Sequence, residues 1–416
     1  MRERLRNRPR LRPKVYGYLT EEKESLRQGF AALFLSSAGE LLAGIVLAGI
    51  AGTLEELVGL AVLIPAAIGM RGAIFGAMGS RLSTSIQTGL FELNLRRGVL
   101  AENVQAAVVL SLVSGVFLAF LARASCEILN VRTELSVFDY VVISTVGGIL
   151  AGILLLGITV LVARLSVARG WDMDNIAAPM LTAAGDILTL PALVLAAYLI
   201  DIPIFSIVLA ALLIVVAALA AYFGLRRGVQ NLRRILAESF PILALTGTVT
   251  ILVGVALQDR EEQFTTLLAL SILLPAFLQE GGALGGILSS RLSSKVHLGL
   301  IAPRGVPQLA AFRDFTLTYI FATGVYVFIG GASHLLAVAL FPADSSPGFL
   351  VMIGVSALAG LIATTAAVLA AYYGSTVSYR LGLDPDTYGI PIITAAVDLL
   401  GFMSLIIALI IFGLTG

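Results

Sequence analysis

Apolar stretches long enough to cross a lipid bilayer recur along almost the whole chain. A membrane-spanning helix needs about 20 predominantly apolar residues, and eleven stretches of the 416-residue chain meet that requirement. They cover residues 28–53, 55–79, 99–122, 137–163, 177–200, 203–223, 239–257, 264–288, 314–341, 348–373 and 388–415. Only 13% of the residues are charged, about half the share found in soluble domains. The sequence therefore predicts an all-α polytopic membrane protein.

The basic residues are distributed unevenly among the predicted connections. Nine Lys and Arg lie in the first 28 residues, and most of the others fall in every second connection. The acidic connectors Glu55–Glu56 and Asp259–Glu262 fall on the opposite side. Since basic connections stay in the cytoplasm, we expect a multi-pass protein of the cell membrane with a cytoplasmic N-terminus and an exocytoplasmic C-terminus.

Net charge and cysteine content exclude several classes of partner and site. The formal net charge of +1 provides no basic excess that could neutralise nucleic-acid phosphates. The single cysteine, Cys126, excludes an internal disulfide framework and a cysteine-based metal cluster. The expected partners are therefore a small cargo and the lipid bilayer, with the basic arm of residues 1–27 lying against anionic lipid.

Two segments of the first half of the chain recur in the second half. Leu63–Gly89 aligns without gaps to Leu273–Gly299 at an offset of 210, and Asp172–Leu190 aligns to Asp384–Phe402 at an offset of 212. Hydrophobic composition alone does not place Pro, Gly, Arg and Asp in register twice, so we predict two five-helix repeats. An even number of spans separates equivalent points, which gives both repeats the same orientation and relates them by a pseudo-two-fold axis along the membrane normal.

These repeats define the predicted parts of the chain. They are a basic cytoplasmic arm (1–27), a first repeat (28–202), a spacer helix with a cytoplasmic linker (203–237) and a second repeat (238–416). Two repeats in one chain already form a pseudo-dimer, so an oligomeric partner is not required. A path on the pseudo-axis would be lined by equivalent residues from both repeats.

The second duplicated segment places an aspartate near the middle of two predicted spans. An ionisable group there costs about 2.5–3.5 kcal/mol and needs a reason. At helical spacing, Thr182 shares a face with Asp186, and Thr394 shares a face with Asp398. Such oxygen ligands suit Mg²⁺, and two carboxylates would neutralise a divalent ion. We predict that these four residues hold a metal ion as transported cargo, with no resident cofactor. The alternative is that both aspartates are protonated packing residues.

Further acidic residues are candidates for secondary cation sites or for the mouths of a path. The pairs Asp172/Asp174 and Asp384/Asp386 begin the two aspartate-bearing helices, where they could gather cations or act as helix N-caps. Glu40 lies in the middle of the first predicted span and Glu280 in the eighth. Glu40 has no counterpart in the second repeat, and it is either a proton or ion site or simply protonated.

Glycines and prolines recur in register in the first duplicated segment. Small residues at i and i+4 permit close helix contact, and prolines imply kinks. The residues are predicted either to pack helices together or to line a pore with opened backbone. They are Pro65, Gly72 and Gly76 in the first repeat and Pro275, Gly282 and Gly286 in the second.

One basic residue falls within a predicted span. Arg71 is one position away from being the equivalent of Glu280, and the two have opposite charge. A buried arginine beside a cation path would repel the cargo unless it is compensated. We therefore expect an Arg71–Glu280 ion pair between the repeats.

Both repeated blocks resemble the MgtE and solute-carrier-41 family of magnesium transporters. The family's P-A-x-x-G…G-N…R-L-S-T pattern is similar to Pro65-Ala66…Gly72-Ala73…Arg81-Leu82-Ser83-Thr84 and to its copy from Pro275 to Ser294. Its second pattern is similar to Asp384-Pro385…Pro391…Thr394…Asp398-Leu399-Leu400-Gly401. The resemblance implies divalent-cation transport, a single-chain two-repeat form, and a role for Asp186 and Asp398 as pore aspartates that hold hydrated Mg²⁺. The chain departs from the family pattern at Ala73 and Ala283, where the family has Asn.

Two other functions remain as alternatives at this point. In a cation/proton or cation/sodium exchanger, the same aspartates would titrate. An intramembrane aspartyl protease is a weaker alternative, based on Gly185-Asp186 and Pro191-Ala192-Leu193. Because both aspartates occupy one duplicated context and not two different motifs, we expect a transporter and not an enzyme.

Overall fold

The predicted all-α membrane architecture is confirmed. The computed structural model describes residues 23–169, 173–226, 230–297, 299, 301–381 and 390–414. No β-strand occurs among them. Ten helices in this part of the chain are long and apolar enough to cross a membrane. The first predicted span corresponds to a helix whose apolar part, Leu33–Gly49, is shorter than the other ten.

The helices follow one another in two similar series, separated by the spacer helix α8. The first series is α2 (Lys23–Gly49), α3 (Ala51–Glu56), the 3₁₀ turn η1 (Leu60–Val62), α4 (Ile64–Gln87), α5 (Val99–Leu129), α6 (Val137–Arg169), α7 (Met173–Ala197) and η2 (Tyr198–Ile200). After α8 (Pro203–Arg226) come α9 (Gln230–Gln258), α10 (Glu261–Thr266), α11 (Leu268–His297), α12 (Leu309–Leu340), η3 (Ala343–Ser345), α13 (Phe349–Leu381) and α14 (Ile390–Ile411).

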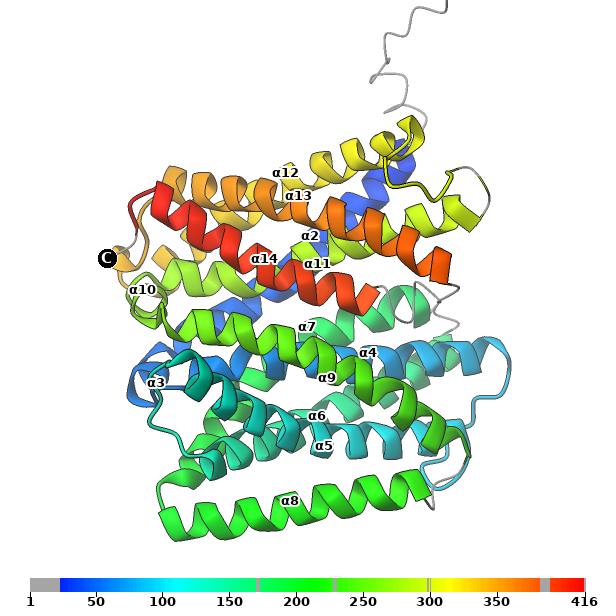
Figure 1. Cartoon of the computed structure of the whole chain (residues 1–416), viewed down its shortest axis with the longest axis vertical. Helices are drawn as coiled ribbons and strands as arrows, with labels where there is room; N and C mark the ends of the chain where they lie inside the picture. Colours follow the sequence, from blue (N-terminus) through cyan, green and yellow to red (C-terminus); the bar gives the residue numbers. More distant parts are fainter. Residues whose placement is uncertain are drawn as a thin grey trace, which may run out of the picture.

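The first long helix of each series lies among helices of the other series (Figure 1). Helix α2 packs on α11 and α12, and α9 packs on α4, α5 and η1. Both helices also keep contact with their own series, α2 through α7 and α9 through α14. Helix α8 covers α5, α6 and α9 at one edge of the molecule. The two series are therefore interlocked, a feature that the sequence did not predict.

Helices α2 and α9, which each pack among helices of the other series, both make a close backbone contact through a glycine. A Cβ atom at Gly44 of α2 would overlap the backbone of Ile272 in α11, and one at Gly254 of α9 would overlap the backbone of Val62 in η1. Both the glycines and their partners are 210 positions apart, which is the offset of the first duplicated segment. Only glycine permits a helix to approach another backbone this closely.

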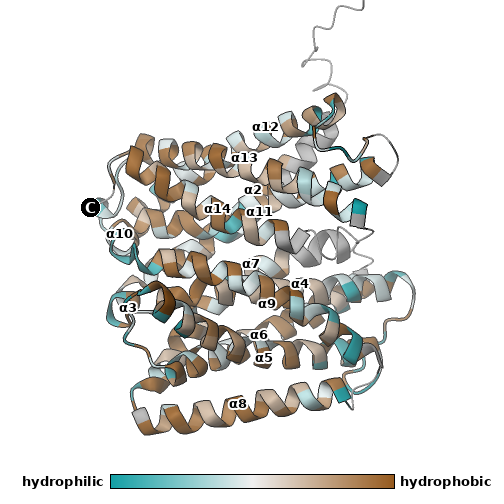
Figure 2. Ribbon diagram, in the orientation of Figure 1, coloured by the Kyte–Doolittle hydropathy of each residue, from teal (hydrophilic) through white to brown (hydrophobic). Residues whose placement is uncertain are grey.

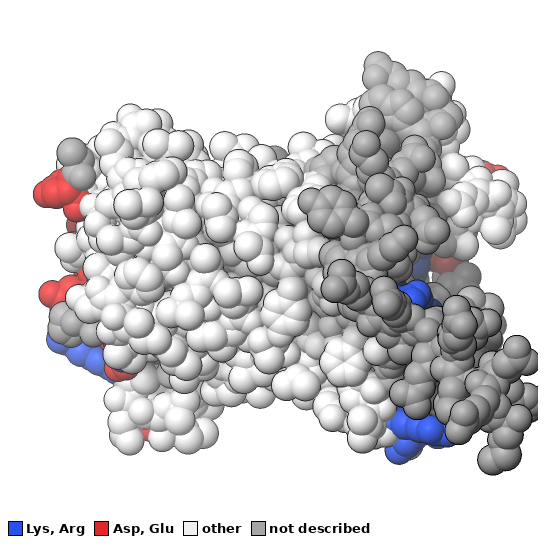
Figure 3. All heavy atoms as spheres, turned by 90° about the horizontal axis from the view of Figure 1, so that it is seen from above, with Lys and Arg blue, Asp and Glu red and all other residues white. Residues whose placement is uncertain are grey.

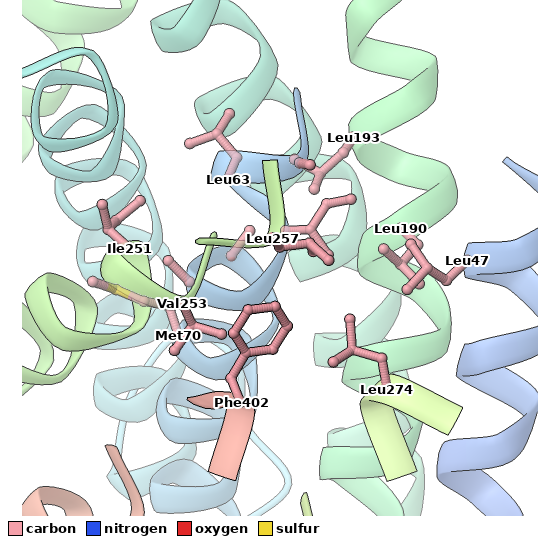
Figure 4. Packing of buried hydrophobic residues seen from close by; sticks show 14 of the residues in the cluster. Leu47, Leu63, Met70, Leu190, Leu193, Ile251, Val253, Leu257, Leu274 and Phe402 are labelled. Atoms are coloured by element: carbon pink, nitrogen blue, oxygen red, sulfur yellow. The ribbon is translucent and has the colours of Figure 1, made fainter. Parts of the chain in front are cut away.

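Buried apolar side chains from both series form one continuous core. Figure 4 shows Leu47 of α2 near Leu190 of α7 and Leu274 of α11, and Phe402 of α14 near Met70 of α4 and Val253 of α9. Leu190 and Phe402 are equivalent positions at an offset of 212. Packing between the two series therefore holds them together as one body.

The surface has the polarity expected of a protein that crosses a bilayer. Hydrophobic residues cover the long helices along most of their length, and hydrophilic residues collect toward both ends of the bundle (Figure 2). In the space-filling view, the charged side chains lie at the two ends, and a broad band between them carries none (Figure 3). Which end faces the cytoplasm stays a prediction.

The repeated Arg-Leu-Ser triplets fix the far ends of α4 and α11 to the next helix. Arg81 Nε donates a 2.6 Å hydrogen bond to Asn103 Oδ1 of α5. In the second series, Arg291 and Lys295 form ion pairs of 3.8 and 2.7 Å with the buried carboxylate of Asp314 in α12. The repeated basic position therefore has a structural role in each half, although the acceptor differs.

The two repeated prolines lie in different contexts, so the prediction of a kink at each was too general. Pro65 is the second residue of α4, in the first helical turn, where the missing N–H breaks no helical bond. Pro275 lies inside α11. The chain before Pro65 instead turns at Gly59. Its φ of 112° lies in the positive region that glycine adopts without strain.

Candidate functional site

The two aspartates of the duplicated segment lie in the last long helix of each series. Asp186 of α7 is 4% exposed, and Asp398 of α14 is half-buried. The structure therefore places one acidic group inside the bundle on each of two equivalent helices. That they act together on one ion stays a prediction.

The predicted threonine ligands lie beside the repeated glycines. A Cβ atom at Gly72 would be 3.6 Å from Cγ2 of Thr182, and one at Gly282 would be 2.8 Å from Cγ2 of Thr394. The Gly282 position is also 3.8 Å from Asp398 Oδ1. These glycines therefore bring α4 against α7 and α11 against α14 at the level of the aspartates.

Gly76 does not share this contact. A Cβ atom at Gly76 of α4 would meet nothing within 4 Å, so close packing is not the reason for a glycine there. Gly286 lies in α11 at the equivalent position. Both stay predictions as pore-lining residues.

Glu40 joins the first aspartate. Its side chain is 1% exposed, and its carboxyl lies at hydrogen-bonding distance from that of Asp186. The backbones approach closely here, because a Cβ atom at Gly39 would be only 2.9 Å from Cβ of Ala183. Neither oxygen of Glu40 has a hydrogen-bond donor among the described residues. Its position beside Asp186 is what the sequence could not show.

Glu280 of α11 also contacts α2. Ser37 Oγ donates a 2.7 Å hydrogen bond to Glu280 Oε1, and Glu280 is fully buried. Its second oxygen, Oε2, lacks a donor within the described part of the chain. Ser37 was missed by the sequence analysis, although its position three residues before Glu40 puts both on one face of α2.

The expected Arg71–Glu280 ion pair was wrong. The described residues contain no ion pair between them, and Glu280 instead accepts from Ser37. Arg71 is 1% exposed and extends toward α6, where a Cβ atom at Gly148 would overlap its guanidinium. Nε and Nη1 of Arg71 have no hydrogen-bond acceptor in the part of the chain that the structure describes. The near-equivalence of the two positions in the repeat does not make them neighbours, because each lies within its own series.

Tyr326 of α12 is a further buried polar group that the sequence analysis missed. It is 1% exposed, and its hydroxyl has no hydrogen-bond partner among the described side chains and backbone. It lies within electrostatic reach of both Glu280 and Asp398. An aromatic residue in an apolar helix gave no signal that could have identified it.

The acidic residues expected at the mouth lie largely beyond what can be placed. Asp172, Asp384 and Asp386 fall outside the described residues, and of Asp174 only the backbone in the first turn of α7 is described. Their role as cation-gathering groups or N-caps stays a prediction.

Two spaces lie at the end of the bundle that carries α3 and α10. A cavity of about 790 Å³ is lined by Asp259, Glu262 and Thr266, among others. A second space, of only about 10 Å³, remains between side chains that include Leu47 and Leu257. Side chains therefore fill most of the interior between Leu47 and Leu257.

A polar clasp fastens the same end. The backbone N–H of Gly59 donates a 2.9 Å hydrogen bond to Oε1 of Gln258 in α9, and Nε2 of Gln258 donates to Glu261. Burial raises the pKa of Glu261, and the nearby Glu55 raises it further, while the bond from Gln258 acts in the opposite direction. The clasp links the two series directly.

The geometry of the carboxylates limits how a metal could be held. Within the described residues, no group of three or more His, Cys, Asp or Glu side chains is arranged to hold one ion. Pairs of carboxylates with water are the arrangement that a strongly hydrated divalent cation accepts.

Comparison with known proteins shows the family. The model of the MgtE family, described as divalent cation transporter, matches residues 64–196 and again residues 274–408. The chain belongs to the MgtE family. The two matches start 210 positions apart and end 212 positions apart, which are the offsets of the two duplicated segments.

Relatives of this MgtE-family chain are solute carriers. Solute carrier family 41 member 2 of Mus musculus is 26% identical over 367 residues, which are 82% of this chain and 62% of the relative. Solute carrier family 41 member 3 of Rattus norvegicus is 25% identical over 394 residues, 89% of this chain and 83% of the relative. The chain thus spans less than two thirds of the member 2 relative. No solved structure is significantly similar to the chain.

Proposed function

We propose that the chain transports a divalent cation, Mg²⁺ in the first place, across the membrane. Membership of the MgtE family supports a divalent cation as cargo. The observation that carries the proposal is the placement of Asp186 and Asp398, which lie buried or half-buried at equivalent positions of equivalent helices. Their carboxylates hold one partly hydrated ion on a path between the two series, and the hydroxyls of Thr182 and Thr394 complete the oxygen lining.

The tight packing near Leu47 and Leu257 supports an expectation about access to the site. We expect an ion at the aspartates to be shielded from the end that carries α3 and α10. We expect cytoplasmic placement of the N-terminus, with that closed end outside. Labelling of single cysteines at residues 2 and 416 in a Cys126-free protein tests this, because labelling from the same side would contradict it.

Transport into proteoliposomes tests the role of the aspartates. Either Asp186→Asn or Asp398→Asn removes one formal charge at constant shape, and each should reduce Mg²⁺ uptake at least about tenfold. The double variant should be no worse than the weaker single variant, because both residues act on one ion. Asp201→Asn, in the exposed turn between α7 and α8, is the matched control and should transport normally. Normal uptake in both single variants would exclude these residues as the site.

A second candidate function is exchange of the divalent cation for protons or Na⁺. The observation that favours it is the presence of Glu40 beside Asp186, which adds a buried carboxyl that the four-residue site does not use. The same liposomes with and without a pH or Na⁺ gradient distinguish the two. Uptake that is independent of both gradients contradicts exchange.

A further inference from the structure

Apart from Asp186 and Asp398, the strongest unexplained feature is the carboxyl of Glu40. It is buried between α2, α7 and α11, and neither of its oxygens receives a hydrogen bond from the described residues. A buried carboxylate is costly unless it is paired or coordinates a metal. Its side chain therefore requires either a proton or a positive partner, and the described part of the chain supplies no positive partner.

The contact between Glu40 and Asp186 points to the same requirement. Ionised carboxylates only accept hydrogen bonds, so two of them at hydrogen-bonding distance repel each other unless a cation or a proton lies between them. Oδ1 of Asp186 also lacks a donor in the described region. The contact is thus a pair of acceptors that face each other across a position suited to a cation.

Glu280 provides the second carboxylate on this side of α2. Ser37 holds Oε1 of Glu280 at 2.7 Å, and the charge of Glu280 acts on Glu40. Because Ser37 and Glu40 are three residues apart on one helix, the bond brings Glu280 to the face that carries Glu40. Oε2 of Glu280 stays without a donor in the described chain and is free to bind a cation.

Arg71, the only buried arginine among the described residues, does not compensate these charges. The guanidinium of Arg71 lies against Gly148 of α6, and none of its interactions involves an acidic side chain among the described residues. Four carboxylates, those of Glu40, Asp186, Glu280 and Asp398, therefore share this interior. One divalent cation would neutralise two of them.

We propose that Glu40, Glu280 and the hydroxyl of Ser37 form a second divalent-cation site between α2 and α11, adjacent to the Asp186/Asp398 site. This inference rests on the proposed function, because the second ion is the same cargo. Two carboxylates and a hydroxyl leave room for the waters that a hard divalent cation retains. Neighbouring sites allow an arriving ion to displace one already bound, which combines binding with release.

The test counts bound ions on the detergent-solubilised full chain, with Mn²⁺ as the probe. Electron paramagnetic resonance of free Mn²⁺ in a titration should give two ions per chain. Glu40→Gln and Glu280→Gln should each reduce the count to one, because each removes one carboxylate of the second site. Ser37→Ala should weaken one of the two sites about tenfold without abolishing it. Thr250→Val is the matched control, since Thr250 occupies in α9 the position of Glu40 in α2, and it should bind two ions.

The outcomes separate this inference from the proposed function. A count of one in the unmodified chain overturns the second site, whether or not the variants fold. A count of two in both Glu→Gln variants overturns it as well, because neither carboxylate would then be needed for the second ion. If Asp398→Asn abolishes Mg²⁺ transport while the unmodified chain binds one ion, the proposed function stands without the second site. If the chain binds two ions but both Asp→Asn single variants transport normally, the proposed site at Asp186 and Asp398 is contradicted instead.

Discussion

Helices α6 and α13 carry a glycine at equivalent positions, Gly148 and Gly360, and the two halves fill the space above that glycine differently. A Cβ atom at Gly148 would overlap the guanidinium of Arg71, which comes from α4. A Cβ atom at Gly360 would overlap the ring of Tyr326, which comes from α12. The position equivalent to Arg71 in the second half is Gly281, and a Cβ atom there would be 3.5 Å from the hydroxyl of Tyr326. A charged side chain and an aromatic one therefore occupy corresponding volumes.

The comparison shows that the repeat preserves glycines at close contacts but only part of its buried charge. The glycines at both helix crossings, and those beside Arg71 and Tyr326, are equivalent, since an added Cβ atom would overlap a neighbour at each of them. Asp186 and Asp398 are also equivalent, whereas Glu40 corresponds to Thr250, and Glu280 to Met70. The two similar series thus enclose a partly asymmetric set of charges.

The largest expected effect on the free energy of unfolding concerns the close helix contacts at Gly44 and Gly254, which both halves share. Gly44→Ala and Gly254→Ala should each destabilise the protein by about 3 kcal/mol, because the added methyl group meets a backbone that cannot move aside. The free energy of unfolding in mixed detergent micelles measures both. Gly69→Ala, which would meet nothing within 4 Å, is the control and should be neutral or slightly stabilising. A large effect at only one crossing would show that the two crossings are not equivalent.

A smaller effect should distinguish the side-chain contact of Arg71 with Gly148 from that of Tyr326 with Gly360. Arg71→Met removes a buried guanidinium whose Nε and Nη1 lack an acceptor in the described chain, and it should stabilise the protein by about 3 kcal/mol. Tyr326→Phe removes only a hydroxyl without a partner there, and it should stabilise by about 1 kcal/mol. Unfolding measurements on both variants give the difference.

The same series tests the absence of contact between Arg71 and Glu280. The effects of Arg71→Met and Glu280→Gln should add within about 0.5 kcal/mol, as they do for side chains that do not touch. Destabilisation by Arg71→Met would mean that the guanidinium has an essential acceptor. It would then contradict the expected order of stabilisation, in which Arg71→Met exceeds Tyr326→Phe.

The smallest effect concerns the clasp, which also belongs to one half. Gln258 and Glu261 correspond to Ala48 and Ala51 in the first series. Burial raises the pKa of Glu261 in the folded protein, so its ionisation opposes folding as the pH rises through that pKa. Glu261→Gln should therefore raise the melting temperature modestly at pH 8 and have progressively less effect as the pH falls toward 4. An increase in the melting temperature that is equal at both pH values would assign the effect to packing alone.

Features with a local or periodic signal could be predicted from the sequence. Long apolar stretches predicted the helices, and the register of Pro65 with Pro275 and of Asp186 with Asp398 predicted equivalent helices that the family model matches twice. Helix ends were less accurate, because α4 and α11 continue past the apolar stretch into the polar Arg-Leu-Ser triplets. The short helices α3 and α10 were missed, since six residues carry too little periodicity.

Features that depend on packing between distant segments could not be predicted. The position of α2 among α11 and α12 follows from the contact at Gly44, which no local pattern reveals. For the same reason Glu40 could be recognised as an unusual residue, but its neighbours Asp186 and Glu280 could not. The Arg71–Glu280 pair failed because equivalence in a repeat relates positions by symmetry, whereas contact depends on which way each side chain extends.

The packing of α2 and α9 against the opposite series has a consequence for synthesis and membrane insertion of the protein. Helix α2 is synthesised first, but the backbone that it meets at Ile272 is about 230 residues further along the chain. At about 5–20 residues per second, α2 waits roughly 10–45 s before that partner leaves the ribosome. During that interval Glu40 is in the membrane or at the insertion machinery without α11 beside it. Biogenesis of this protein therefore depends on an early helix that can meet α7 of its own series first but reaches α11 and α12 only after nearly two thirds of the chain has been synthesised.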